Sequence, residues 1–271
     1  MNNPLVTILI PNYRTLKLTK LCLRLLKKHT DMNKIHVIVI DNDSQDASLD
    51  YLRRLDWIEL IERKAAPDDT PPLSHCRALD LGLSRVQTPY FLSIHTDTFV
   101  TDPRWLNVLL SEIEKSDNIA GVGSWKLESK PAWRRFLKQL ESYWQQFYFK
   151  LIGKPHKIAG AGKNYYFLRS HCALYRKNLF DKLGLTFSEG NECAGKRVHK
   201  ALVDAGYEMV FLESDYLSRY MDHLNHATLI LNPELGSKKK TITKGLKRIQ
   251  WKLASINAEA ILADDDLDQI K

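Results

Sequence analysis

Residues Ile35 to Asp46 read IHVIVIDNDSQD, and this stretch decides the fold. Its first half, at 35–40, is nearly continuous in β-branched residues, which is typical of a parallel strand covered on both faces. Its second half is polar, and Ser44 or Asp46 can cap a following helix. A buried parallel strand that ends in polar residues and leads into a helix predicts an α/β fold.

The same alternation of strand and helix continues through the first 125 residues. Apolar runs that read as strands occur at 5–10, 35–40, 57–63, 90–95 and 119–125. Segments with helical spacing lie between them, at 18–28, 47–55, 73–86 and 104–115. This order predicts a Rossmann-like, mostly parallel sheet with helices on both faces.

Composition narrows the class of protein. The chain has 271 residues, 44% of them hydrophobic, so it can bury one sizeable core. No apolar run approaches the roughly 20 residues that span a bilayer, and no charged leader precedes the first run, so we expect a cytoplasmic protein. The four cysteines are scattered without a CxxC pair, which argues against a zinc knuckle or a disulfide framework.

The formal net charge of +8 favours anionic partners. Basic residues are in excess from Lys126 to Lys157 and again after Gly236, whereas the first 125 residues are nearly balanced. We find no helix-turn-helix, RNP or zinc-finger pattern, so we expect no nucleic-acid partner. Phosphate on a small ligand or on a membrane is the better match.

Polar clusters directly follow three of the predicted strands. They are Pro11-Asn12-Tyr13, Asp41-Asn42-Asp43 and His95-Thr96-Asp97. In open α/β sheets ligands bind at the carboxyl ends of the strands, so the topology brings these clusters to one edge. Any one cluster alone fits ordinary loop polarity, but the three together predict a binding site.

The glycine-rich motifs that hold phosphates are absent, since the sequence contains neither GxGxxG after the first strand nor GxxxxGK(S/T). Carboxylates repel phosphate unless a divalent cation lies between them, and Mg²⁺ or Mn²⁺ suits such oxygen ligands. We therefore expect Asp97, with His95 nearby, to hold a cation that bridges a diphosphate. Asp41 and Asp43 can accept hydrogen bonds from a base or a ribose.

Three motifs together resemble a known family. VTILIPNYR at 6–14, VIVIDNDSQD at 37–46 and PYFLSIHTDTFVTDPRWL at 89–106 are similar, in order and spacing, to the nucleotide-binding half of a family 2 glycosyltransferase with the GT-A fold. The resemblance covers about the first 125 residues and thins afterwards. Its specificity comes from the set of motifs rather than from any one of them.

The resemblance implies roles for particular residues. Pro11, Tyr13, Asp41 and Asp43 would contact the nucleotide. Asp97 would be the metal-binding aspartate of the family's DxD motif. This sequence departs from the motif at its first position, where His95 replaces an aspartate.

The helix before the fourth strand carries His75 and Arg77, in a region where the family often places a polar residue near the nucleotide or the donor sugar. A solvated helix start is the alternative for His75. Arg77 can pair with a phosphate or with one of the site's carboxylates.

The second half of the chain supplies the remaining candidates. The resemblance implies a general base ahead of a Gly-Tyr pair, and Glu192 fits by its distance from Gly206, with Glu189 in reserve. A favourable charge in a helix's first turn is the alternative reading of Glu192. The family often supplies a late histidine to the metal or the diphosphate, which favours His223 and, second, His226.

Three parts are expected along the chain. Residues 1–125 form the nucleotide-sugar-binding half, 126–232 an acceptor-binding half with an amphipathic insertion, and 233–271 a basic helical C-terminal extension. A stripe of apolar residues at 131–151 reads either as a core-facing helix or as a helix lying on a membrane. Within the extension, ADDDLDQ at 263–269 reads as a solvated tail.

With the resemblance, these features predict an inverting glycosyltransferase of hexosyl- or deoxyhexosyl-transferring type, acting in surface polysaccharide assembly. The donor would be a nucleotide-diphosphate sugar, the cofactor a divalent cation (Mn²⁺ or Mg²⁺), and the acceptor a glycan or a lipid-linked molecule. A peripheral position on the inner membrane face stays open. The alternatives are a sugar nucleotidyltransferase, whose glycine-rich N-terminal signature is missing, and a non-catalytic GT-A-like scaffold at a membrane surface.

Overall fold

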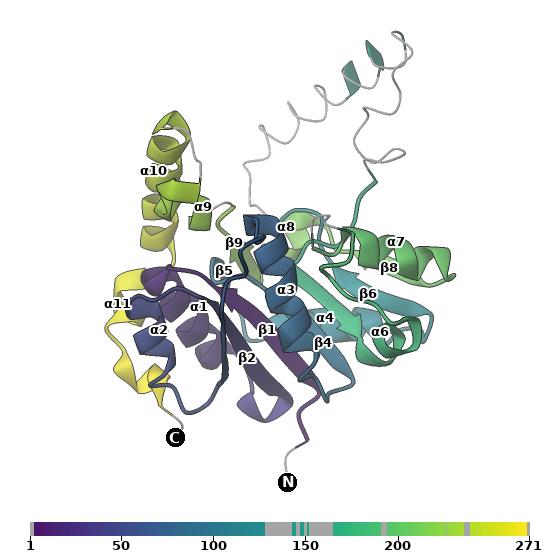
Figure 1. The fold of residues 1–271 in the computed structure, drawn as a ribbon, viewed down its shortest axis with the longest axis horizontal. Helices are drawn as coiled ribbons and strands as arrows, with labels where there is room; N and C mark the ends of the chain where they lie inside the picture. Colours follow the sequence, from purple (N-terminus) through teal and green to yellow (C-terminus); the bar gives the residue numbers. More distant parts are fainter. Residues whose placement is uncertain are drawn as a thin grey trace.

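The computed structural model describes most of the chain. The described residues are 3–127, 143–144, 147–148, 151, 165–190, 194–225, 227–235 and 239–269. They fold around one central sheet, and the C-terminal segment returns to lie beside α1 (Figure 1).

Within these residues, seven strands form the central sheet in the order β3-β2-β1-β4-β7-β6-β8. They are β1 (Val6–Asn12), β2 (Ile35–Asn42), β3 (Glu59–Arg63), β4 (Tyr90–Ile94), β6 (Ile119–Gly123), β7 (Cys172–Arg176) and β8 (Glu208–Phe211). A separate two-stranded sheet pairs β5 (Thr98–Val100) with β9 (Met221–His223). Only the two pairings of β7 in the central sheet are antiparallel, so the predicted mostly parallel sheet is confirmed.

The described helices connect and cover these strands. The α-helices are α1 (Leu16–His29), α2 (Ala47–Leu52), α3 (Pro71–Leu83), α4 (Trp105–Ile113), α6 (Lys177–Leu183), α7 (Lys196–Asp204), α8 (Ser214–Leu217), α9 (Ala227–Leu231), α10 (Lys239–Ser255) and α11 (Ala258–Leu262). Short 3₁₀ helices are η1 (Met32–Lys34), η4 (Pro233–Leu235) and η5 (Asp265–Asp268).

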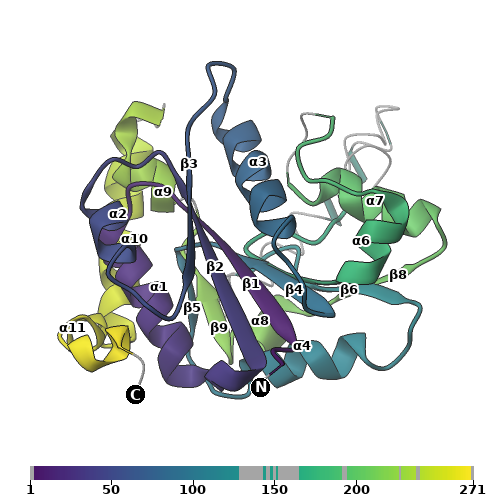
Figure 2. The ribbon, with the colours of Figure 1, turned by 60° about the horizontal axis from the view of Figure 1, so that its bottom comes forward.

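Helices cover both faces of the sheet (Figure 2), and alternation along the strands sends side chains into two separate cores, one on each face. Ile8 and Ile10 of β1 share a buried cluster with Trp105 of α4, together with α1 and the C-terminal helices. Leu9 points to the opposite face and joins Leu79 of α3, together with α6 and α7. Each such burial stabilises the fold by about 1.5–3 kcal/mol. The predicted helices on both faces are therefore confirmed.

The alternating pattern does not predict β7, which lies antiparallel between β4 and β6. Leu174 of β7 pairs with Leu92 on one side and with Val122 on the other. Because β7 is antiparallel, its first residues lie at the same edge of the sheet as the last residues of β1, β2 and β4. That edge consequently receives Ser170 and His171, which immediately precede β7.

Local signals set the helix ends. Asp46 caps α2 by accepting a hydrogen bond from the Ser48 amide, as the sequence predicts. Thr70 and Pro71 start α3 two residues earlier than expected, and α3 ends at Leu83. Gly206, with φ of 89°, follows α7 and turns the chain into β8.

The C-terminal acidic segment is exposed at 263–266 and 269, as predicted, but it is anchored to α1 and is not a free tail. Arg24 of α1 is fully buried, and its guanidinium donates to Asp265 (2.6 Å) and to both oxygens of Asp268 (2.5 and 2.9 Å). It also donates to the carbonyls at 261–262. The Tyr51 hydroxyl donates to Asp268 at 2.7 Å. A buried cation far away in the sequence therefore holds the segment in place.

The predicted stripe at 131–151 lies mostly outside the described residues. Its described members, Trp144, Phe147 and Leu151, are 72%, 62% and 73% exposed, so these side chains do not pack into the core. Among the helices of the described ranges, none combines the length and the apolar character needed to cross a bilayer.

Candidate active site

His95, Asp97 and His223 meet just beyond the end of β4. β4 ends at Ile94, directly before His95, so His95 and Asp97 lie in the turn that leads into β5. β5 pairs with β9 so that Thr98 lies opposite His223, which brings this histidine to the turn. The Leu224 amide donates to the Asp97 carbonyl at 2.9 Å and fixes the two segments together.

One oxygen of the Asp97 carboxylate is anchored, and the other faces two imidazoles. The Ala227 amide donates to Oδ2 at 3.2 Å. Oδ1 lies 3.1 Å from Nε2 of His223 and 3.7 Å from Nδ1 of His95. Oδ1 and His223 Nε2 are buried, and neither has a hydrogen-bond partner of suitable geometry within the described residues. Ligand atoms of the three residues lie within 4.8 Å of one another, so they fit a divalent cation.

The electrostatics of these groups also suit a cation. Burial opposes ionisation of Asp97, but His223, His95 and the Ala227 amide outweigh it, so the pKa of Asp97 lies below its ordinary value. Burial, with a further contribution from His75, lowers the pKa of His95 well below its ordinary value. The side chain of His95 nevertheless keeps 30% of its surface exposed. A carboxylate with two imidazoles can offer a cation one negative charge and nitrogen lone pairs.

His75 lies against His95 rather than at a solvated helix start. Its ring is edge-on to the His95 ring, with centroids 4.9 Å apart. Nε2 of His75 lies 3.0 Å from Oγ of Ser170, and Nε2 of His95 lies 2.9 Å from the same oxygen. Burial lowers the pKa of His75 to about 4, although Asp97 acts in the opposite direction. One serine hydroxyl thus joins two imidazoles.

A fourth imidazole, His171, completes the cluster. Its ring stacks on that of His223, with centroids 4.5 Å apart and planes 14° from parallel. Its Nε2 lies 3.0 Å from Oγ of Ser124, and burial lowers its pKa well below the ordinary value. His171 therefore holds His223 by its face, whereas Ser170 contacts the edge of His95.

Arg169 places a positive charge beside the cluster. Its guanidinium lies 4.8 Å from the centre of the Trp125 ring and 5.3 Å from that of Phe167. Burial is the main cause of the lowered pKa values of His95 and His171, and the charge of Arg169 lowers both further. A half-buried arginine held between aromatic rings is suited to an anionic group such as a phosphate.

Asn12 and Asp41, both predicted to contact the nucleotide, are bonded to each other inside the protein. The Asn12 amide donates to Asp41 Oδ1 at 2.7 Å and to the hydroxyls of Ser44 and Ser48 at 3.2 and 3.0 Å. Asp41 also accepts hydrogen bonds from the amide and the hydroxyl of Ser44 at 2.9 and 2.5 Å. These side chains join the ends of β1 and β2.

Pro11, Thr96 and Tyr13 lie near the same edge in different surroundings. Pro11 is buried within β1, and Thr96 is buried with its hydroxyl 3.1 Å from that of Thr15. Tyr13 is half-buried, and the Arg14 guanidinium lies 5.2 Å from its ring centre. Of these three predicted residues, Tyr13 keeps the most surface exposed.

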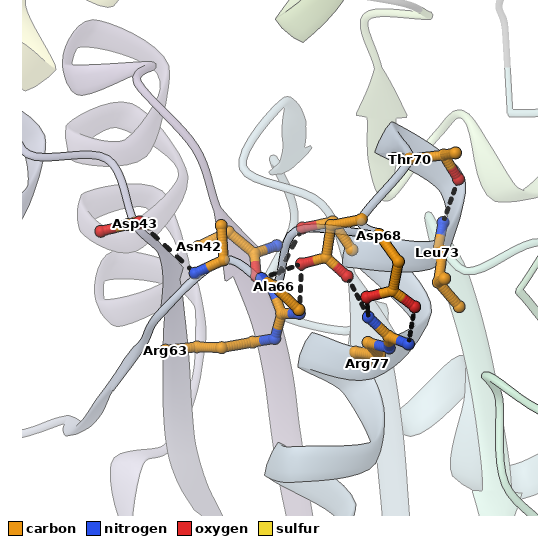
Figure 3. A network of polar contacts seen from close by, with 11 residues as sticks. Asn42, Asp43, Arg63, Ala66, Asp68, Thr70, Leu73 and Arg77 are labelled. Atoms are coloured by element: carbon orange, nitrogen blue, oxygen red, sulfur yellow. Dashed lines mark hydrogen bonds and ion pairs between the residues drawn. The ribbon is translucent and has the colours of Figure 1, made fainter.

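A polar network joins the end of β2 to the loop before α3 (Figure 3). Asp43 adopts a left-handed conformation with φ of 61°. The pKa of the Asp43 carboxyl is lowered. A hydrogen bond from Gln45 is the largest cause, and contacts with the Ala65 amide and Lys64 add to it. Arg63, at the end of β3, donates to the Asn42 side chain at 3.1 Å.

Arg77 pairs within this network rather than with Asp41, Asp43 or Asp97. Its guanidinium donates to Asp68 at 2.7 Å and to Asp69 at 2.6 Å, as Figure 3 shows for the Asp68 pair. Arg63 pairs with the other oxygen of Asp69. The sequence did not single out Arg63, Asp68 or Asp69, because their pairing depends on how the 64–70 loop folds back.

One of the two candidate bases, Glu189, lies among the described residues. Glu189 is half-exposed and forms an ion pair with Arg197 of α7. Glu192 and the second candidate histidine ligand, His226, lie outside the described residues.

Comparisons with known proteins identify a family and similar folds. The family model described as glycosyl transferase family 2 matches residues 7–184. Among solved structures, the chain is similar to the mannosyltransferase PcManGT from Pyrobaculum calidifontis in complex with GDP-Man and Mn²⁺, with a TM-score of 0.55 and 17% identity over 97% of this chain and 75% of that one. It is also similar to residues 1–349 of TarS from S. aureus, with a TM-score of 0.53 and 13% identity over 85% of this chain and 63% of that one. No curated protein sequence matches the chain.

Proposed function

The chain belongs to glycosyl transferase family 2, and from that premise we propose that it transfers a sugar with inversion from a nucleotide-diphosphate donor. The observation that carries the proposal is the cluster of His95, Asp97 and His223 at the carboxyl edge of the sheet. Family membership supports glycosyl transfer over the nucleotidyltransferase and scaffold alternatives.

His95, Asp97 and His223 would hold a divalent cation, Mn²⁺ or Mg²⁺. The bound cation would neutralise negative charge on the diphosphate of the donor. The similar mannosyltransferase structure contains GDP-Man and Mn²⁺, which supports this choice of ligand and metal. Arg169 would add a second positive charge toward the leaving diphosphate, since it lies beside the same cluster.

The nucleotide would lie against the ends of β1 and β2. Tyr13 and Asp43 keep surface exposed there, so we assign them the direct contacts with the base or ribose. Pro11 would shape the wall of the site, and Asn12 and Asp41 would fix the turn through their mutual hydrogen bonds. Asn42 would act through Arg63, whose guanidinium connects it to the 64–70 loop.

A carboxylate must accept the proton of the acceptor hydroxyl as that oxygen bonds to the anomeric carbon and the bond to the nucleotide diphosphate breaks. We assign this role to Glu192, with Glu189 second. The ion pair with Arg197 occupies the carboxylate of Glu189, which supports this order.

The acceptor would be a glycan or a lipid-linked molecule used in surface polysaccharide assembly, handled at the inner membrane face. The outer face of α10 supports a contact with anionic lipid. Lys244 and Lys247 are exposed on this face, and Trp251, 70% exposed, follows at helical spacing.

Flotation with phosphatidylglycerol vesicles tests this contact of α10 with anionic lipid. Lys244→Glu with Trp251→Ala should reduce binding, whereas Lys34→Glu on η1 should not, and equal binding by all variants would contradict it.

The proposed reaction is tested by measuring free nucleotide released from a panel of UDP- and GDP-sugars, with Mn²⁺, with Mg²⁺ and with chelator. We expect release from one donor that requires the cation and is lost in Asp97→Asn. Cation-independent release, or release unchanged in Asp97→Asn, would contradict the assignment of the cluster. Circular dichroism of the variant confirms that the fold is retained.

A further inference from the structure

The hydroxyl of Ser170 lies between two imidazoles that face it with the same ring nitrogen. Its Oγ is 2.9 Å from Nε2 of His95 and 3.0 Å from Nε2 of His75. Ser170 itself is buried in the connection that leads into β7. This connection is fixed on both sides, because the Arg169 amide donates to the Ser124 carbonyl and the Cys172 amide donates to the Arg169 carbonyl.

A serine hydroxyl carries one proton, so it can donate to only one of the two rings. It must therefore accept a hydrogen bond from the other ring if both contacts are satisfied. Each neutral imidazole carries one N–H and one lone pair. Either His95 donates to Ser170 and Ser170 donates to His75, or the chain of donors runs the other way.

The two directions have opposite consequences at the metal cluster. If His95 donates through Nε2, its Nδ1 carries a lone pair toward Oδ1 of Asp97, 3.7 Å away. If His95 instead accepts at Nε2, its Nδ1 carries the proton, and that nitrogen cannot bind a cation. Only the first direction makes His95 a ligand.

We propose that Ser170 and His75 are positioning residues that keep the proton of His95 on Nε2, so that its Nδ1 is available to the cation. In this arrangement Nε2 of His75 accepts the hydrogen bond that Ser170 donates. Metal-binding histidines usually have such a partner on their second nitrogen, and removing it weakens metal binding by about 10–100-fold. The inference rests on the proposed cation site.

The other histidine ligand is held in a different way. His223 stacks on His171, and its Nδ1 has no hydrogen-bond partner within the described residues. The Ser124 hydroxyl is hydrogen-bonded to His171, which is not one of the proposed ligands. Of these two buried serines, Ser170 is the one whose hydroxyl contacts a proposed ligand ring, that of His95.

The test compares the two serines in the full chain without donor. Long-range ¹H–¹⁵N spectra of ¹⁵N-histidine-labelled protein report the tautomer of His95, and electron paramagnetic resonance of free Mn²⁺ gives the dissociation constant. In the wild type we expect the proton on Nε2. Ser170→Ala should shift the tautomer and weaken Mn²⁺ binding about 10–100-fold, and Ser170→Thr, which keeps the hydroxyl, should restore both.

Two more variants complete the test. His75→Phe removes the acceptor of Ser170 and should also shift the His95 tautomer, whereas Ser124→Ala should leave that tautomer unchanged. A proton on Nδ1 in the wild type, or wild-type Mn²⁺ affinity in Ser170→Ala, would overturn the inference. Asp97→Asn distinguishes failure of the proposed cation site from failure of the proposed roles of Ser170 and His75. If Asp97→Asn binds Mn²⁺ normally, the assignment of the cation site is wrong. If Asp97→Asn loses Mn²⁺ binding but the Ser170 and His75 variants do not, only the roles of Ser170 and His75 are wrong.

Discussion

His95 replaces an anionic ligand by a neutral one in the proposed cation site. With Asp97 as the single carboxylate of the cluster, the protein contributes one negative charge and nitrogen atoms from two imidazoles. Mg²⁺ prefers oxygen ligands, whereas Mn²⁺ accepts imidazole more readily. The residue types at this site should therefore decide which metal supports the reaction.

The first prediction is that Mn²⁺ supports turnover better than Mg²⁺ and that His95→Asp reduces this preference, because an aspartate adds charge and oxygen ligands. Turnover with each metal at saturating donor measures the ratio. Ser124→Ala serves as the control, because it alters a neighbouring serine–histidine contact without changing the tautomer of His95. An unaltered ratio in His95→Asp would remove His95 from metal selection.

A second prediction concerns the base. Glu192→Gln should lower turnover by roughly 10²-fold or more with donor affinity nearly intact, because the amide cannot accept the acceptor's proton. Glu189→Gln provides the matched comparison. If the larger loss occurs in Glu189→Gln, the two roles are exchanged.

At this scale, polar residues directly after an apolar strand predicted His95 and Asp97, whereas His223 was predicted from the resemblance to the family. It did not predict Ser170 or His171. These residues precede an apolar run, and polar residues at the start of a strand reach the same edge only if that strand is antiparallel. Nothing local in the sequence determines the direction of β7.

Among the elements, β6 and β7 approach each other closely at Gly123. A Cβ on Gly123 would overlap the carbonyl oxygen of Cys172 and lie 3.1 Å from Cα of Ala173. The backbone of a paired strand cannot move aside as a side chain can. This glycine is therefore required by close approach, and the pairing of Gly123 with Ala173 depends on it.

The third prediction is that Gly123→Ala lowers the free energy of unfolding by about 1–3 kcal/mol, the usual cost of overpacking. Gly121→Ala is the matched control in the same strand. Its Cβ would lie 2.8 Å from Cε of Met209, which can rotate away, and 2.9 Å from Cδ1 of the Tyr175 ring, so it meets side-chain atoms and not backbone. Urea denaturation measures both, and equal losses would contradict the backbone explanation.

The sequence predicted the elements of the first half well because β-branched runs and helical spacing are local properties. β5 and β9 have three residues each, too few to show a period. The place of β7 between β4 and β6 depends on pairing between distant residues. Local patterns therefore identified the layers of the fold but not the completed strand order.

For the whole molecule, the buried Arg24 connects the N-terminal and C-terminal ends of the chain. Burial opposes ionisation of the Asp268 carboxyl, but the hydrogen bonds from Arg24 and Tyr51 outweigh it, so the pKa of Asp268 is lowered. A carboxyl whose pKa is lower in the folded protein stabilises the fold above its unfolded pKa, about 3.9. That contribution is lost as the pH falls through the folded pKa.

The fourth prediction follows from this linkage. Asp268→Asn should lower the Tm at neutral pH. The difference from the wild type should shrink as the pH falls below about 4 and disappear below the lowered pKa of the folded protein, where both carry an uncharged group. Arg24→Met should destabilise the fold by about 3–5 kcal/mol, because the carboxylates lose their buried partner. Asp264→Asn is the control. A Tm difference independent of pH would contradict the ionic contribution of Asp268.

The position of β7 also affects how the protein is made. A nascent chain that has emerged as far as Ile94 has three parallel strands beside β4, but the other edge of β4 stays unpaired until Cys172–Arg176 leaves the ribosome. At about 5–20 residues per second, that wait is on the order of ten seconds. During it, the open backbone of β4 can pair with another nascent chain. Slow synthesis between these strands would therefore favour aggregation.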